Sequence, residues 1–306
     1  MRAVNGKDKV EYATNVSSCK VSRNVNNPFS FLQWNVNGLY SKLTDTEFVH
    51  YVGSFDFVCL VEMFMDEFTS TVFDGYLLFV KSTVKFTKQG RRSGGVLCLI
   101  RKEFAPFVRK LDVECSNFIV FILDKILFGI TKDILYVCAY VPPEGSPYYS
   151  FFDLDNGVSL LEECLTECLL TEGDVYVVLS GDLNSRTSNM SQPVLQDHDV
   201  FDLLHKSQSV CGNRKSQDQI LNSYGKYLLN MCTALGLCIL NGVCNGDMQG
   251  CFTYMSERGS SVNDYFLLSN DLFAITLSSS ELLVAGRIES DHMPVEFHVT
   301  FPCDNV

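Results

Sequence analysis

Residues 175–184 read VYVVLSGDLN, a strand-like run of five apolar residues followed by a polar turn. Side chains alternate across a strand, so Asp182 and Asn184 share one side, and Gly181 lets another backbone approach closely. An aspartate can take a proton from water while an asparagine one pleat away donates to a phosphoryl oxygen. Phosphate-ester hydrolysis needs this division of labour. An ordinary strand-to-turn junction is the structural alternative.

Two earlier apolar runs also end in side chains that can bind a metal or a phosphate, as expected where a site is built at sheet ends. Residues 31–34 lead into Asn35 and Asn37, which share one face before a glycine, although asparagine is also a usual turn residue. Residues 57–61 lead into Glu62. Burying an unpaired carboxylate costs several kcal/mol, so Glu62 must be exposed at the strand tip, paired, or bound to a cation.

Later polar residues add a candidate dyad. Tyr140 ends a further apolar run before two prolines, where an ordinary core tyrosine is the default interpretation. Asp264 precedes another apolar run, and Asp291 and His292 precede the final one. A carboxylate that accepts from one imidazole nitrogen fixes the tautomer and raises the basicity of the other, so a cationic His292 could face a phosphate at neutral pH. A surface His-Asp pair is the alternative.

Short apolar runs alternate with turn clusters from Pro28 onward, and more of them read as strands than one open sheet of ordinary size holds. The predicted strands are 29–34, 55–61, 76–80, 95–100, 118–123, 134–141, 175–179, 238–240, 251–254, 265–268 and 295–301. Apolar residues at helical spacing predict helices at 158–169 and 228–235, with a weaker one at 44–51. We therefore expect an α/β fold of two packed sheets with helices outside.

The chain is expected to form one domain. Residues 1–27 have no helical or strand period and are predicted to be a polar tail, residues 28–301 a single domain, and residues 302–306 a C-terminal tail. A composition of 46% hydrophobic and 20% charged residues excludes a disordered or fibrous chain. The 13 cysteines include no CxxC pair, and the closest two, Cys164 and Cys168, lie in a helical pattern, so we interpret them as reduced core thiols.

Nothing in the sequence resembles a signal peptide or a membrane span. We expect a soluble, intracellular protein that is not secreted and has no membrane partner, located in the nucleus or the cytoplasm.

In chain order the motifs N-x-N-G, E, Y-x-P, G-D-x-N, N-D-Y and S-D-H resemble those of the exonuclease–endonuclease–phosphatase superfamily. That superfamily includes AP endonucleases, deoxyribonuclease I-like enzymes, inositol polyphosphate phosphatases and the endonuclease domains of LINE-type (non-LTR) retrotransposons. The resemblance covers about residues 29–301. The stretches NSYGKYLL at 222–229 and LCILNG at 237–242, with Arg186-Thr187 after GDLN, are similar to the retrotransposon branch.

The resemblance implies a DNase I-like, four-layer α/β sandwich of two packed mixed β-sheets flanked by helices, with a divalent-metal phosphodiesterase site at one edge. It implies that Glu62 is the main ligand of Mg²⁺, or of Mn²⁺ in its place, with Asn37 and Asp291 also on the metal side. It further implies catalytic roles for Asn35, Tyr140, Asp182, Asn184, Asp264 and His292. Among these, Asp182 would orient or deprotonate the attacking water, and Asp264 would orient His292.

Three positions depart from the family pattern. Asn37 stands where AP endonucleases carry aspartate, which favours the retrotransposon branch over abasic-site repair. Met63 replaces the usual polar residue after the metal-binding glutamate, and Leu183 replaces the common aromatic residue in G-D-x-N. None of the three removes a catalytic group, so we expect an active enzyme.

The net charge of −12 excludes long-range attraction to nucleic acid, so DNA would have to be held locally. Residues 81–102 contain seven basic residues and no acidic one, which could grip phosphates, although a solvated loop is the alternative. The residues we expect to contact DNA are Lys81, Lys85, Lys88, Arg91, Arg92, Arg186 and Thr253.

The sequence therefore predicts a Mg²⁺-dependent endonuclease that nicks one strand of double-stranded DNA and leaves a 3′-hydroxyl. In the retrotransposon branch that end primes reverse transcription, so a reverse transcriptase is expected as a partner in trans. Two alternatives remain open. The first is a phosphatase or phosphodiesterase of the same superfamily acting on a small phosphate ester, and the second is an inactive binding module derived from a retrotransposon.

Overall fold

The computed structural model describes residues 27–65, 68, 71–85, 92–190 and 214–302. The predicted tails at 1–27 and 302–306 lie almost entirely outside these residues, as do Lys88 and Arg91. In the described part, no helix is long and apolar enough to cross a membrane.

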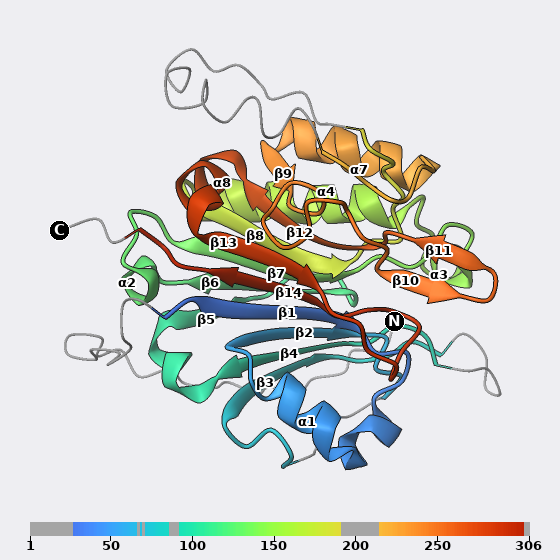
Figure 1. Ribbon diagram of the computed structural model, residues 1–306, viewed down its shortest axis with the longest axis horizontal. Helices are drawn as coiled ribbons and strands as arrows, with labels where there is room; N and C mark the ends of the chain where they lie inside the picture. Colours follow the sequence, from blue (N-terminus) through green and yellow to red (C-terminus); the bar gives the residue numbers. More distant parts are fainter. Residues whose placement is uncertain (1–26, 66–67, 69–70, 86–91, 191–213, 303–306) are drawn as a thin grey trace.

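The first sheet has six strands in the order β13-β14-β1-β2-β4-β3 (Figure 1). Its strands are β1 (Phe29–Asn35), β2 (Phe57–Val61), β3 (Tyr76–Lys81), β4 (Val96–Arg101), β13 (Ser280–Val284) and β14 (Val295–Val299). The central strands β1 and β2 are parallel, and all other neighbours are antiparallel. The first and last strands of the chain pair with each other, with Phe29 opposite Val299.

The second sheet repeats this plan in the order β5-β6-β7-β8-β12-β9. Its strands are β5 (Val108–Leu111), β6 (Phe118–Leu123), β7 (Ile134–Tyr140), β8 (Tyr176–Asp182), β9 (Leu237–Ile239) and β12 (Asp264–Ser269). The central pair, β7 and β8, is again the parallel one. Each sheet therefore has one point at which the carboxyl ends of two parallel strands lie side by side.

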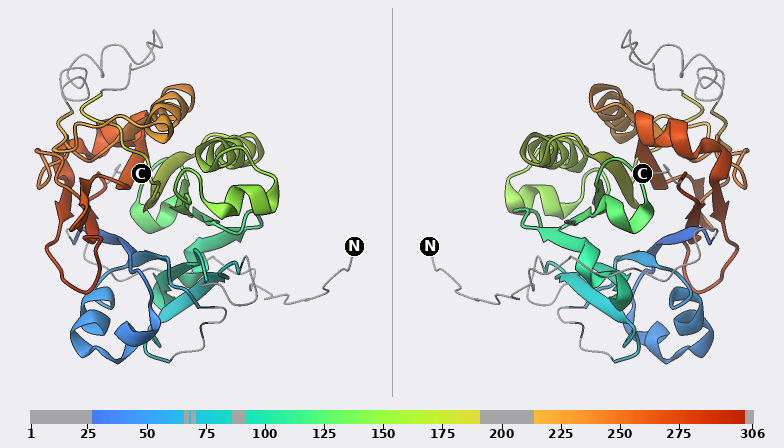
Figure 2. Two further views of the ribbon diagram at one scale, coloured as in Figure 1. Left: turned by 90° about the vertical axis from the view of Figure 1, so that its right-hand side faces the viewer. Right: turned by 90° about the vertical axis from the view of Figure 1, so that its left-hand side faces the viewer.

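Helices cover the outer faces of both sheets. The helices are α1 (Thr46–Val52), α2 (Lys125–Phe128), α3 (Pro147–Phe152), α4 (Gly157–Glu172), α7 (Ser223–Ala234) and α8 (Asn270–Thr276), with 3₁₀ turns at 40–44, 102–107 and 277–279. Figure 2 shows α1 at one end of the stack and α4 and α7 at the other. Phe48 of α1 packs on Trp34 of the first sheet, and Leu161 of α4 shares a core with Leu179 of the second. These contacts confirm the predicted four-layer sandwich.

Between the sheets lies a core rich in aromatic rings, in which Phe31 stacks on Phe57 with ring centroids 4.6 Å apart. Alternation along β1 carries the inward face from Phe31 to Gln33 and Asn35, while on β8 it runs from Val178 to Ser180 and Asp182. At one end of the sandwich the apolar core thus gives way to buried polar side chains.

The predicted interior strands and the helices α4 and α7 are confirmed, but three strands were missed. Two of them, β5 and β13, each form one edge of a sheet. Edge strands expose one face and carry charged residues, here Arg109, Lys110 and Glu281, so their sequences lack a clear apolar pattern. The third, β11 (Gly259–Ser261), pairs with β10 (Tyr254–Ser256) in a hairpin that starts later than the predicted strand at 251–254.

One local expectation needs adjustment, and another is met. The helix predicted from Thr44 begins at Thr46, because the Asp45 side chain accepts from the backbone N–H of Glu47 and Phe48 and so caps it. All ten cysteines in the described residues are free thiols, and nine of them are buried, in agreement with the prediction.

Candidate active site

The polar end of the inter-sheet core is where the two parallel strand pairs end. Asn35 ends β1, Glu62 follows β2, Tyr140 ends β7 and Asp182 ends β8. In the second sheet Asp182 lies opposite Tyr140 on one side and opposite Asp264 on the other. Carboxyl ends of parallel strands meet at one sheet edge, so the fold itself brings these five polar residues together.

Both carboxylate oxygens of Asp182 accept a hydrogen bond. Its Oδ2 accepts from Asn35 Nδ2 at 2.8 Å, which joins the two sheets, and its Oδ1 accepts from the backbone N–H of Asn184 at 3.1 Å. The Asn184 amide donates to the carbonyl of Val141 at 2.9 Å. These contacts hold Asp182 in one orientation with its carboxylate 1% exposed.

His292 and Asp264 form the predicted dyad. His292 Nδ1 lies 2.8 Å from Asp264 Oδ2, which leaves Nε2 facing Asp182 Oδ2 at 4.0 Å. Gln33 Nε2 donates to the other Asp264 oxygen at 3.0 Å, and the Thr253 hydroxyl accepts from the Asp264 backbone N–H at 3.1 Å. A carboxylate bound on both oxygens keeps the imidazole in a single orientation.

Burial and charge set the protonation of the dyad and its neighbour. Burial alone lowers the pKa of His292, but the charges of Asp264, Asp182 and Asp291 outweigh it and raise that pKa to about 10. His292 is therefore a cation at neutral pH. Burial, followed by the charge of Asp264, raises the pKa of Asp182 to about 8. The carboxyl groups of Asp182 and Asp264 thus lie at one end of the core together with the imidazolium of His292.

Glu62 lies beside Tyr140 at the same end. The Tyr140 hydroxyl donates to Glu62 Oε1 at 2.6 Å, and burial together with the Glu62 charge raises the pKa of Tyr140 above its ordinary value. Glu62 has a left-handed backbone, with φ of 55°, and its carbonyl accepts from the N–H of Gly38 at 2.8 Å. The segments after β1 and β2 are therefore joined at the site.

Asn37 and Asp291 meet next to this junction. Asn37 Nδ2 donates to Asp291 Oδ1 at 3.0 Å, and the Asn37 N–H donates to Asn35 Oδ1 at 3.0 Å. The Ser290 hydroxyl donates to the carbonyl of Asn35 at 2.8 Å. The S-D-H segment is thus fastened to the N-x-N segment, although 254 positions separate Asn37 from Asp291.

Two groups of side chains at this end could hold a cation. The ligand atoms of Asp182, Asp264 and His292 lie within 4.8 Å of one another. However, metal ligation requires a neutral imidazole, and His292 is protonated and already bonded to Asp264. The oxygen donors of Glu62, Asn37 and Asp291 are of the type that Mg²⁺ prefers. The segments that carry these three side chains are joined by the bond from Asn37 to Asp291 and by the bond from the Gly38 N–H to the Glu62 carbonyl, and a cation there would offset the excess of carboxylates.

The predicted basic segment divides between the two ends of the first sheet. Its first part connects β3 to β4. Just before β4 the chain passes Tyr140, because a Cβ on Gly94 would lie 3.5 Å from the Tyr140 ring. Lys85 is exposed and Arg92 is half-buried. The Lys81 ammonium donates to the carbonyl of Val113 at 3.1 Å. Arg101 and Lys102 end β4 and lie at the opposite end of the sheet.

Two other expected DNA contacts are engaged within the protein. Arg186 forms two hydrogen bonds to Asp218, at 2.7 and 2.6 Å, and its side chain is 27% exposed. Thr253 is fully buried, and its hydroxyl accepts from the N–H groups of Asn263 and Asp264. Thr253 is therefore placed to hold Asp264 in position rather than to reach a ligand.

Sequence analysis missed three residues that support the site. Gln33 bonds Asp264, Asn241 Nδ2 donates to the Asp264 carbonyl at 3.1 Å, and Ser290 bonds Asn35. Gln33 is a polar residue inside an apolar run, two places before Asn35, so alternation along β1 could have identified it. Asn241 and Ser290 lie in the LCILNG and S-D-H stretches, but their partners are 23 and 255 positions away, so the sequence did not show what they contact.

Comparison with known proteins gives matches in structure only. No protein-family model and no curated protein sequence matches the chain. The AP endonuclease LMAP from Leishmania major superposes with a TM-score of 0.62 and 16% identity, over 94% of this chain and 92% of that protein. The endonuclease domain of TRAS1, a telomere-specific non-LTR retrotransposon, gives 0.54 and 15%, over 90% and 99%. A 3′-5′ exonuclease from Neisseria meningitidis gives 0.56 and 15%, over 89% and 100%. The chain thus has the DNase I-like fold predicted from its motifs.

Proposed function

We propose that this chain is a metal-dependent DNA endonuclease that hydrolyses one phosphodiester bond and leaves a 3′-hydroxyl. The observation that carries the proposal is the Asp264–His292 dyad directed at Asp182, next to the Glu62–Tyr140 pair. A protonated imidazole, a buried carboxylate of raised pKa and a set of oxygen donors are the groups that phosphodiester hydrolysis requires.

In the proposed reaction Asp182 accepts a proton from the attacking water. Its pKa of about 8 is close to the working pH of a general base. The water oxygen bonds to phosphorus while the bond from phosphorus to the 3′ oxygen breaks. That oxygen takes up a proton, so the products are a 5′-phosphate and a 3′-hydroxyl.

His292 and Asn184 stabilise the charge that develops on the phosphoryl oxygens. The imidazolium donates from Nε2, since Nδ1 is held by Asp264. Asn184 has to release the Val141 carbonyl before its amide can bind a phosphoryl oxygen. A bound Mg²⁺, or Mn²⁺ in its place, would supply further positive charge beside the scissile phosphate and would be held by Glu62, Asn37 and Asp291.

Double-stranded DNA is the proposed substrate. The segment with Lys85 and Arg92 leads into Gly94, which lies beside Tyr140. A cavity of about 150 Å³ is lined by Arg186, Tyr254 and Arg258. The Tyr254 ring packs on His292 with centroids 4.8 Å apart. All three superposed proteins are named as nucleases, which favours a polynucleotide over a small phosphate ester.

The likeness to the TRAS1 domain supports a place in retrotransposition, with a reverse transcriptase that extends the new 3′ end in trans. An intracellular location, in the nucleus or the cytoplasm, is part of the same proposal. The boundaries of the catalytic domain are proposed at residues 28 and 301.

A plasmid-relaxation assay tests the proposed activity. Wild-type protein with Mg²⁺ should convert supercoiled plasmid to the nicked form, and DNA polymerase should extend the nick without phosphatase treatment. His292→Gln should lose activity by at least about 10²-fold. His298→Gln is the matched control. His298 also pairs with a carboxylate, at 3.2 Å from Glu296, but it lies on the face of the first sheet that is turned away from the second sheet.

The metal side is tested in the same assay with Glu62→Gln, for which exposed Glu103→Gln is the control. Release of phosphate from inositol phosphates without nicking would instead identify a small-molecule phosphatase. DNA binding with no turnover under any metal condition would indicate an inactive binding module.

A further inference from the structure

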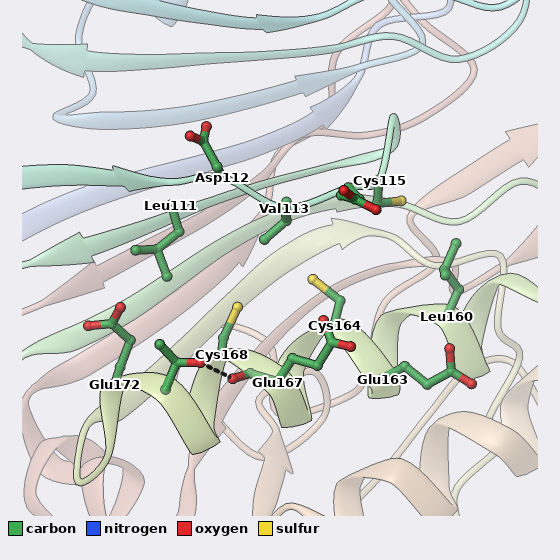
Figure 3. Close-up of a pocket in the computed structure, with 12 residues that line it drawn as sticks. Leu111, Asp112, Val113, Cys115, Leu160, Glu163, Cys164, Glu167, Cys168 and Glu172 are labelled. Atoms are coloured by element: carbon green, nitrogen blue, oxygen red, sulfur yellow. Dashed lines mark hydrogen bonds between the residues drawn. The ribbon is translucent and has the colours of Figure 1, made fainter. Parts of the chain in front are cut away.

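A second candidate site lies on the outer side of the second sheet, between α4 and the connection from β5 to β6. It is a cavity of about 430 Å³ (Figure 3). Its walls are the segment Leu111–Cys115 and one side of α4 from Leu160 to Glu172. None of the catalytic groups lines it.

Two cysteines of α4 point into this cavity (Figure 3). Leu160, Cys164, Cys168 and Glu172 follow one another at intervals of four residues and so form one stripe along the helix. The thiols of Cys164 and Cys168 are close enough to change each other's ionisation. The Cys164 thiol lowers the pKa of Cys168, and the Cys168 thiol raises that of Cys164.

Helix geometry makes a direct bond between the two sulfur atoms unfavourable. On an intact α-helix the Cα–Cβ bonds of residues four apart are nearly parallel and both lean toward the N-terminus. A disulfide needs Cβ atoms that converge to about 3.8 Å. Parallel thiols one turn apart are instead suited to hold a third atom between them.

The surroundings of the thiols are strongly acidic. The residues that line the cavity include five carboxylates, and no described lining residue is basic; the carboxylates are Asp112, Glu114, Glu163, Glu167 and Glu172. Arg109 lies nearby but is paired with Glu172 at 2.5 Å, and Lys81 donates to the Val113 carbonyl. Glu163 and Glu167 are exposed at the rim, so their long side chains are free to turn inward.

We propose that this cavity binds a thiophilic divalent cation of the Zn²⁺ class through Cys164 and Cys168, with carboxylates of the cavity completing the coordination. Zinc is bound in proteins by thiolate sulfur together with carboxylate oxygen, whereas Mg²⁺ avoids sulfur. Binding replaces the two thiol protons with the cation and releases them to solvent. The cation would tie α4 to the β5–β6 connection, independently of the catalytic site.

Cadmium titration tests the proposal, because a cadmium–thiolate bond gives an ultraviolet charge-transfer band that oxygen ligands do not give. Wild-type protein should show the band at one equivalent of Cd²⁺, and Zn²⁺ should abolish it by competition. The double variant Cys164→Ser/Cys168→Ser should lose the band. Cys232→Ser, which removes a buried thiol on α7, should keep it, and so should His292→Gln.

Alkylation of the wild-type protein gives a second readout that needs no variant. Bound Zn²⁺ should protect Cys164 and Cys168 from a thiol reagent by at least tenfold in rate, measured peptide by peptide, with Cys251 unprotected. A band of unchanged intensity in the double variant, or equal labelling of Cys164 and Cys168 with and without Zn²⁺, would overturn the proposal.

Discussion

Three residues at the site, Asn37, Glu62 and Asn184, have left-handed backbone conformations, with φ of 40°, 55° and 48°. Such values cost a non-glycine residue about 1 kcal/mol or more and tend to occur where function requires them. Glu62 directly follows β2, and Asn37 and Asn184 come two residues after the ends of β1 and β8, so the change of φ turns the chain away where each strand stops. The sequence predicted which residues these are, but not their conformation.

Asp182 should reduce the stability of the metal-free protein at high pH. Its pKa is raised to about 8, above the unfolded value, so its contribution to stability is fully present below about pH 4 and is lost as the pH rises through 8. We compare the free energy of unfolding of Asp182→Asn with that of the wild type. This difference should shift in favour of the variant by at least about 1 kcal/mol between pH 5 and pH 9, and the variant should lose hydrolysis.

Urea unfolding of both proteins at the two pH values, with a chelator present, measures this difference. Asp155→Asn, at an exposed position before α4, is the control. An effect of Asp182→Asn that does not vary with pH would show that Asp182 titrates normally.

The charge of His292 should depend on Asp264. With a pKa raised to about 10, the imidazolium contributes stability that is fully present below about pH 6.5 and is lost as the pH rises through 10. Burial lowers the pKa of His292, and Asp264 carries the largest of the charges that raise it. In Asp264→Asn the pKa of His292 should therefore fall toward neutral pH, and activity should drop on the order of 10²-fold at pH 7.5.

NMR titration of the His292 ring measures this pKa directly. The wild-type ring should not titrate between pH 5 and 8, whereas the Asp264→Asn ring should. A wild-type midpoint near 6.5 would contradict the assignment of a cationic dyad.

At the scale of the elements, close approach of backbones explains two glycines in the sequence motifs. A Cβ on Gly181 would lie 2.1 Å from the Ala139 carbonyl of β7, and one on Gly225 would lie 1.9 Å from the Arg186 carbonyl. In the NSYGK stretch, Asn222 caps α7 and also accepts from the Arg186 N–H at 2.9 Å. This stretch therefore fastens α7 to the chain that follows the GDLN motif.

Gly181→Ala should separate β7 from β8 where Asp182 ends the strand. The clash is with backbone, which cannot turn away, so we expect a loss of about 3 kcal/mol in the free energy of unfolding. Gly75→Ala is the control, because a Cβ there meets nothing within 4 Å, and it should change stability by less than about 0.5 kcal/mol. Equal midpoints of thermal unfolding for the two variants would refute this account.

The apolar sequence pattern identified buried helices and strands more accurately than exposed ones. Strands covered on both faces, such as β2 and β7, are continuous apolar runs and were identified within a few residues. Helices of at most seven residues show little helical period, so α2, α3 and α8 were missed and α1 was predicted only weakly. The edge strands β5 and β13 were missed because charged residues interrupt their apolar pattern, whereas the edge strands β3 and β9 are mostly apolar and were predicted.

Across the whole molecule, the site depends on contacts between distant parts of the sequence. The bond from Gln33 to Asp264 spans 231 positions. Only the resemblance of the ordered motifs to a known family allowed the site residues to be grouped from the sequence. The contact of Asn241 with the Asp264 carbonyl is recognisable only once the sheets are packed.

A bound cation should stabilise the entire fold. Mg²⁺ that binds the folded protein alone raises the free energy of unfolding by about 2.7 kcal/mol at a hundred times its Kd. Glu62→Gln should lose most of this increment without losing stability in chelator, since it removes one of the carboxylates that repel each other. Thermal unfolding with Mg²⁺ and with chelator measures both effects. An equal Mg²⁺ increment in Glu62→Gln would place the cation elsewhere.

Because β1 pairs with β14, the first sheet can be completed only when almost the whole chain has been synthesised. On the ribosome β1 emerges 260 residues before β14, as the interval from Asn35 to Val295 shows, and until then one edge of β1 is open to chaperones and to other nascent chains. His292 is translated just before β14. A premature stop codon anywhere upstream of it therefore leaves a product that neither closes its first sheet nor contains the Asp264–His292 dyad.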